Sequence, residues 1–211
     1  AVQWVLGCEF DRSKERRQAG AAALGEKTST TRLEDNQADN SDLFVQASAP
    51  LSEQLSAVAG LRYSSVRFAS QDHFLSDGDG SGSVRYQATN PVLGLTYHAS
   101  NSLNLYANYG KGFESPTLVE VAYSGGGKPA FNTALFASRS RHYELGAKWV
   151  PMAQSRLDFT LFQIDSSDEI VVASSTGGSA TFKNAPGKTW PSSFSAGKWS
   201  TGATFNKNCS N

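Results

Sequence analysis

The sequence predicts an all-β fold, an antiparallel up-and-down transmembrane β-barrel, present as a fragment of about eight strands of a larger barrel. Apolar residues alternate with polar or small ones in segment after segment, which is the side-chain period of a strand with two different faces. The connections alternate between short and long. The 19 glycines and 11% aromatic residues also suit strands and turns better than helices. We expect either part of a barrel wall or an open, curved sheet.

The alternating segments are expected to pair consecutively, with the first, third, fifth and seventh running outward through the membrane and the others running back. In the first of them, Trp4 and Leu6 share one face while Gln3 and Glu9 share the other. The expected strands lie near residues 2–10, 41–50, 54–70, 86–99, 102–112, 139–150 and 154–172, followed by a return near 180–185.

The connections support the membrane interpretation. Short links are expected at residues 50–54, 99–102 and 151–154. Outer-membrane barrels have short periplasmic turns and long extracellular loops, whereas a soluble sandwich does not need one end of every hairpin to be long. The long polar connections are expected at residues 11–41, 70–85, 112–138 and 173–179.

Aromatic residues mark the edges of the expected apolar band. Tyr143 and Trp149 bracket Leu145 and Ala147 on one face of a single strand, as expected where a barrel wall meets the lipid headgroups. Charged residues on the opposite face suit a wet lumen or a plug. The residues expected to face lipid are Leu61, Leu95, Leu105, Leu145 and Phe159, and those expected to face inward include Arg62, His98, Asn104, Glu144 and Lys148.

Other functional classes find little support. The 19 basic and 19 acidic residues balance, so no nucleic-acid partner is indicated. Cys8 and Cys209 have no zinc-site spacing and are expected to be unlinked. The segment 77–81 resembles a calcium loop but lacks the required glutamate, so a flexible extracellular loop is expected. His73, His98 and His142 lie on separate segments. We therefore expect no catalytic residue, metal site or cofactor.

Four motifs, in order, resemble TonB-dependent outer-membrane receptors. Residues 106–120 run from an aromatic strand into Gly-Phe, Pro-Thr-Leu and an acidic residue. Residues 140–149 resemble the returning strand of the family, residues 161–171 the next outward strand, and residues 182–185 the start of its return. Residues 60–63 fit as well. The family-motif residues are Gly112, Phe113, Pro116, Glu120, Glu144 and Gly146.

The resemblance implies a piece of a barrel of about 22 strands with an N-terminal plug. It implies a receptor of a Gram-negative outer membrane that imports a scarce solute, with a ferric siderophore as the leading candidate. Its implied partners are the TonB complex through the plug, the solute, and outer-membrane lipid and lipopolysaccharide. The resemblance covers residues 1–189, and the pattern drifts over residues 190–211, so we expect a fragment without plug or terminal strands.

Inward residues in the outer halves of strands, together with the loop edges, are expected to contact the solute. Inward residues in the inner halves, His98, Asn104, Glu144 and Lys148, are expected to contact the plug. Two alternatives remain open, a small closed eight-stranded barrel with a structural or adhesion role and an outer-membrane enzyme. The closed barrel requires residues 2–10 to pair with residues 180–185. The expected solute contacts are Tyr86, Asn108 and His142 by parity, and Arg139 and Arg141 at the loop edge.

Overall fold

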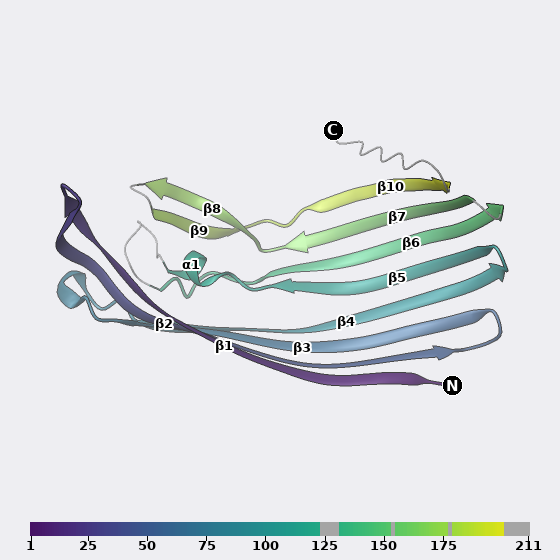
Figure 1. Ribbon diagram of the computed structural model, residues 1–211, viewed down its shortest axis with the longest axis horizontal. Coiled ribbons are helices and arrows are strands. Elements are labelled where there is room, and N and C mark those ends of the chain that lie inside the picture. The colour runs from purple at the N-terminus through teal and green to yellow at the C-terminus, as the bar shows by residue number, and fades with distance from the viewer. Residues whose placement is uncertain (123–130, 153–154, 177–178, 201–211) are drawn as a thin grey trace.

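The computed structural model describes residues 1–122, 131–152, 155–176 and 179–200, and they form mostly long strands (Figure 1). Within these ranges, no helix has the length and hydropathy needed to cross a membrane. The elements are β1 (Gln3–Ala23), β2 (Glu26–Pro50), β3 (Leu55–Asp72), η1 (Leu75–Asp77), β4 (Gly82–Ser100), β5 (Leu103–Glu114), α1 (Leu118–Val121), β6 (Ser138–Met152), β7 (Ser155–Ser167), β8 (Glu169–Thr176), β9 (Ser179–Ala185) and β10 (Thr189–Ser200).

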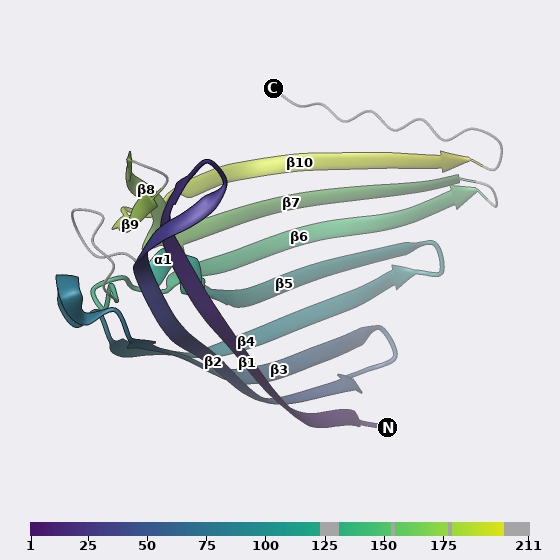
Figure 2. The ribbon, with the colours of Figure 1, turned by 60° about the vertical axis from the view of Figure 1, so that its left-hand side comes forward.

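Eight strands form one open antiparallel sheet in the order β1-β2-β3-β4-β5-β6-β7-β10. The sheet is curled, like a barrel cut lengthwise (Figure 2). The predicted fold class is confirmed. The closed eight-stranded alternative is wrong for the part of the chain that is described, because β1 pairs only with β2 and β9 pairs only with β8. The wall strand after β7 is β10, so pairing continues past residue 189, the expected end of the barrel segment.

The register keeps the expected faces together across the sheet. Leu105 lies opposite Tyr97 on one side and Ala147 on the other, and Ala147 lies opposite Phe159. Leu145 lies in the next row, and its side chain is 59% exposed. The predicted lipid-facing residues therefore share one face. A row of exposed leucines and aromatics requires an apolar surrounding, which the hydrocarbon core of a bilayer provides.

The opposite face is concave. The short helix α1 lies inside the curve of the sheet (Figure 2), where Arg32 of β2 donates a hydrogen bond to the carbonyl of Ala122 (3.2 Å). Nearer the periplasmic end of this face, Arg62 forms ion pairs with Asp42 (2.9 Å) and Glu9 (3.4 Å). Arg62 therefore lies on the inward side, as its parity predicts.

The prediction of a long loop at residues 11–41 is wrong. These residues extend β1 and β2 into one long hairpin, which turns at Leu24 (φ 52°) and Gly25 (φ 85°). Both positive φ values match the tight turns that join twisted antiparallel strands. Arg12 forms an ion pair with Asp39 across the hairpin. A strand outside the membrane needs no apolar face, so its polar composition was mistaken for that of a loop.

The expected single strand over residues 154–172 is also divided. Asp168 adopts a left-handed conformation (φ 56°) between β7 and β8. A non-glycine residue in this region redirects the chain, and β8 leaves the sheet to form a separate hairpin with β9. The short link expected at 151–154 lies partly outside the described residues.

Candidate functional site

Residues 116–121, which follow β5 and carry part of the family motif, pack at the base of the loops at the outer ends of the strands. Pro116 is fully buried. Thr117 caps α1 in a capping box, in which its side chain accepts from the backbone of Glu120 and the Glu120 carboxylate accepts from the Thr117 N–H (2.6 Å). This reciprocal pair satisfies amide groups that a helix start leaves free. Val121 is thereby placed at 0% exposure in the centre of the loop core.

Tyr86 belongs to this core. It packs with Phe68, Val121 and Leu135, and its hydroxyl donates to the carbonyl of Leu135 (2.9 Å). Burial, followed by the nearby charge of Glu120, raises the pKa of Tyr86 to about 12. With 7% of its surface exposed, Tyr86 holds the segment before β6 against β4. Its expected contact with a solute stays a prediction, and its observed contacts are with the loop.

A hollow of about 490 Å³ lies beside this core, on the concave face at the outer ends of β5, β6 and β7. His142 is exposed there, and its Nε2 lies 2.8 Å from the hydroxyl of Ser140. Glu169 accepts a hydrogen bond from Ser166 (2.6 Å). The hollow therefore presents an imidazole, hydroxyls and carboxylates that can bind a polar solute. Its lining is Gly112, Phe113, Glu114, Glu120, Ser138, Ser140, His142, Ile164, Ser166, Glu169, Ile170 and Val171.

Sequence reasoning named His142 as a site residue, and Gly112, Phe113 and Glu120 as family-motif residues, but it did not name Ser138, Ser140 or Glu169 for this site. Ser138 and Ser140 have the same parity as His142 on β6, so counting by two could have found them. Glu169 lies beyond the turn at Asp168, and no periodicity runs through that turn. The structure brings it to the hollow through the β8–β9 hairpin.

The other inward residues lie lower on the concave face. Asn108 lines a second hollow of about 360 Å³ that reaches the inner parts of β2 and β3. The Nδ1 atom of His98 lies 2.6 Å from the side-chain oxygen of Asn104. The ammonium group of Lys148 lies 5.3 Å from the ring centre of Tyr106, and Glu144 lies between Asn108 and Phe162 in the sheet. Contact of His98, Asn104, Glu144 and Lys148 with a plug stays a prediction.

Arg139 and Arg141 are not brought together with His142. The register of β6 is continuous from Arg139 to Trp149, so both arginines share the face of Tyr143 and Leu145. That face is convex. A solute held inside the curve would reach them only over the loop edge, and the expected contact of Arg139 and Arg141 with a solute stays a prediction.

Gly146, a family-motif residue, lies under an aromatic ring on the concave face. A Cβ added there would lie 2.2 Å from the Cζ atom of Tyr106. We expect Gly146→Ala to destabilise the protein by about 1–3 kcal/mol, because the ring must move and lose its hydrogen bond to Thr160 (2.9 Å). Equilibrium unfolding of the full-length receptor in detergent micelles measures this. Gly110→Ala is the control, since its Cβ would have no neighbour nearer than 3.6 Å; equal losses would contradict the explanation.

The segment resembling a calcium loop is closed by its own hydrogen bonds. Asp79 accepts from the backbone of Ser81 (2.9 Å), and Asp72 accepts from Gly80 (3.0 Å). Hydrogen bonds from Ser81 lower the pKa of Asp79. Within the described ranges no three His, Cys, Asp or Glu side chains are grouped to hold a metal ion. Cys8 is a free, exposed thiol, and Cys209 lies outside the described residues.

A curled antiparallel wall with an apolar convex face, and a polar concave face closed by loops, defines the barrel part of an outer-membrane transport receptor. The family model described as "TonB dependent receptor-like, beta-barrel" matches residues 2–205. The chain belongs to this family. The members of the family are receptors of Gram-negative outer membranes and not enzymes.

Solved structures share the fold at low sequence identity. The copper transporter OprC has a TM-score of 0.71 at 13% identity, over 87% of this chain and 30% of its own. The ferric-catecholate import receptor Fiu from E. coli K12 has a TM-score of 0.68 at 15% identity, over 96% and 33%. The ferric yersiniabactin uptake receptor FyuA from Yersinia pestis has a TM-score of 0.62 at 16% identity, over 85% and 27%. The chain thus spans about a third or less of these receptors.

Proposed function

We propose that this chain forms part of the wall of a receptor that imports a ferric siderophore, or a similar scarce chelate, across the outer membrane. The hollow at the outer end of the concave face carries the proposal. A solute arriving from outside would meet this hollow first, between the ends of β5–β7 and the β8–β9 hairpin. Its polar lining suits a hydroxyl-rich or amide-rich chelate, which hydrogen-bonds through oxygen and nitrogen.

The similar structures support iron as the metal of the solute. Fiu and FyuA are described as receptors for ferric catecholate and ferric yersiniabactin. OprC is described as a copper transporter, so the fold is compatible with more than one cargo. The residues named for the site, and not the wall as a whole, must therefore select the solute.

We propose that a plug closes the pore of this receptor and links it to its source of energy. In a barrel of the family's width, a strand wall alone leaves an aqueous lumen. We propose that a plug contacts the inner concave residues, among them His98, Asn104, Glu144 and Lys148. Through that plug the receptor would engage the TonB complex. The lower concave face is polar and partly charged, as a surface that meets a folded plug requires.

We expect His142→Ala to weaken binding of the imported chelate by roughly threefold to tenfold, because one hydrogen-bonding side chain is lost from the solute hollow. The measurement is equilibrium binding of radioactive ferric siderophores to cells that express the protein. His98→Ala is the matched control. It removes another exposed concave histidine, but one near the periplasmic end. If both variants bind alike, His142 does not belong to the solute site.

A further inference from the structure

The β8–β9 hairpin is held by contacts other than strand pairing with the wall. Within the described residues its two strands pair only with each other. Ile170 and Phe182 pack against the buried loop core around Leu135. Asn184 lies opposite Ile170 and two residues beyond Phe182, so these three side chains share one face of the hairpin. Asn184 is therefore placed where the hairpin meets the loop core.

The side-chain amide of Asn184 bonds to three backbone groups. Its Oδ1 accepts from the N–H of Phe136 (2.8 Å), and its Nδ2 donates to the carbonyl of the same residue (2.9 Å). Nδ2 also donates to the carbonyl of Asp168 (2.8 Å). An asparagine side chain offers both donors and an acceptor, so it can meet both polar groups of Phe136 as a neighbouring strand would. Asn184 thus clamps the turn at Asp168 to the segment before β6.

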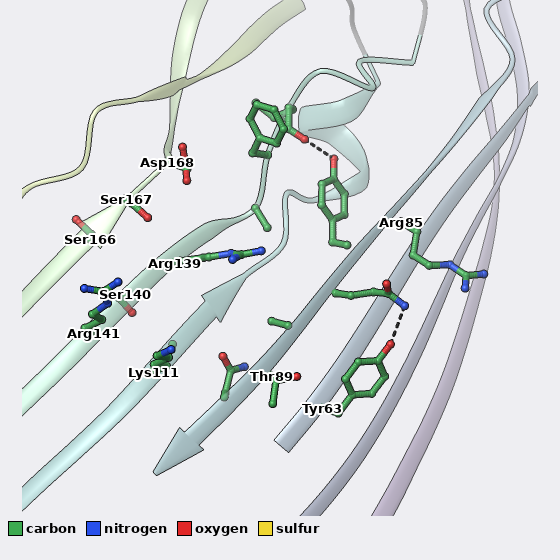
Figure 3. Close-up of a pocket in the computed structure, with 18 of the residues that line it drawn as sticks. Tyr63, Arg85, Thr89, Lys111, Arg139, Ser140, Arg141, Ser166, Ser167 and Asp168 are labelled. Atoms are coloured by element: carbon green, nitrogen blue, oxygen red, sulfur yellow. Dashed lines mark hydrogen bonds between the residues drawn. The ribbon is translucent and has the colours of Figure 1, made fainter. Parts of the chain in front are cut away.

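The turn at Asp168 is not held by its own conformation or by close packing. Its φ of 56° lies in the left-handed region, which a residue with a side chain adopts at a cost in free energy. Figure 3 shows Asp168 beyond Ser166 and Ser167, where β7 ends. Asp168 and Phe136 border a hollow of about 970 Å³, which leaves open space on that side of the turn. The hydrogen bonds from Asn184 therefore fix the turn.

The turn in its place determines where Glu169 lies. Glu169 is the next residue and the first of β8, and it lines the solute hollow, where its carboxylate accepts from Ser166 (2.6 Å). A change in the backbone angles of Asp168 would displace Glu169 first. We propose that Asn184 is a positioning residue of the solute site, which keeps the carboxylate of Glu169 in the hollow by clamping the Asp168 turn. The effect on binding rests on the proposed function, whereas the placement of Glu169 does not.

Asn184→Asp in the full-length receptor tests the clamp without a change in side-chain size. An aspartate can still accept from the N–H of Phe136, but its second oxygen would face the carbonyls of Phe136 and Asp168. The backbone amides of residues 168–170 are expected to exchange with deuterium roughly tenfold faster, while those of β6 and β7 exchange as before. Mass spectrometry measures the exchange. An unchanged rate at residues 168–170 would overturn the proposal.

Asn132→Ala is the matched control. Asn132 joins the same two segments, because its Nδ2 donates to the carbonyl of Phe182 (3.4 Å), but within the described residues neither of its side-chain hydrogen bonds reaches the Asp168 turn. Exchange at residues 168–170 is expected to stay unchanged in this variant. Equal acceleration would mean that general docking of the hairpin holds the turn, and the proposal would be wrong. Asn184→Ala adds no charge and is expected to match Asn184→Asp.

Binding of radioactive iron(III) complexes of catecholate and hydroxamate siderophores tests the action through Glu169. Asn184→Asp is expected to weaken binding roughly threefold to tenfold. In a receptor that already carries Glu169→Ala it should cause no further loss, because the side chain that it positions is absent. An equal loss with and without Glu169 would overturn the proposal, since Asn184 would then act on the whole hairpin. If the unchanged receptor binds none of these complexes, the proposed function fails and the exchange measurement decides whether the clamp places Glu169.

Discussion

In the full-length receptor, Leu105→Arg is expected to reduce the stability of the folded protein in a bilayer by about 2–4 kcal/mol, because it places a charge on the lipid face near the middle of the apolar band. Leu105 lies between Tyr97 and Ala147 in its row, and 41% of its surface is exposed on the convex face. Reversible unfolding in lipid vesicles measures the change. The loss of stability should approach zero when the arginine is placed further out than Tyr109 and Tyr143, which mark the outer edge of the apolar face.

Asn104→Arg is the matched control for this prediction. Asn104 is the sequence neighbour of Leu105, at nearly the same depth, but it faces the concave side and lies close to His98 (2.6 Å). An arginine there can remain hydrated, so its effect should be far smaller. Equal losses for Leu105→Arg and Asn104→Arg would show that the two faces do not differ as the sheet requires.

The 211-residue chain, expressed alone, is expected neither to close nor to span a bilayer. β1 and β10 are the edges of the open sheet and expose unpaired backbone groups. Each unpaired group costs several kcal/mol in hydrocarbon, so an open edge is not tolerated there. In water, the convex leucines and aromatics form a broad apolar surface that favours aggregation.

Refolding into detergent micelles checks this second prediction. The expected product is aggregated, or migrates in electrophoresis without a difference between heated and unheated samples. A monomeric, compact band that shifts on heating would mean that the sheet closes on itself. Such a result would revive the closed eight-stranded barrel, in which β1 must find a new partner.

The sequence by itself determined the wall strands β1 to β7 within the membrane and the two faces of the wall. It placed the next wall strand near residues 180–185, which is wrong, because those residues pair with β8 and the strand beside β7 is β10. Side chains on a strand alternate with a period of two, so the lipid-facing parity of Leu61, Leu95, Leu105, Leu145 and Phe159 follows from local spacing alone. The same count placed His142 on the concave face. Applied strictly to Arg139 and Arg141, it would also have placed them on the convex face, since no bulge interrupts β6 between Arg139 and Trp149.

Only the tertiary structure decided where each pairing ends. Residues 11–41 have the composition of a loop, yet they remain extended because each strand of the hairpin satisfies the backbone of the other. The turn at Asp168, the burial of Tyr86 under Leu135 and the end of the β4–β5 pairing at Val92 and Gly110 depend on partners distant in the sequence. Periodicity reports which face a residue occupies. What lies opposite that face depends on how the strands are assembled.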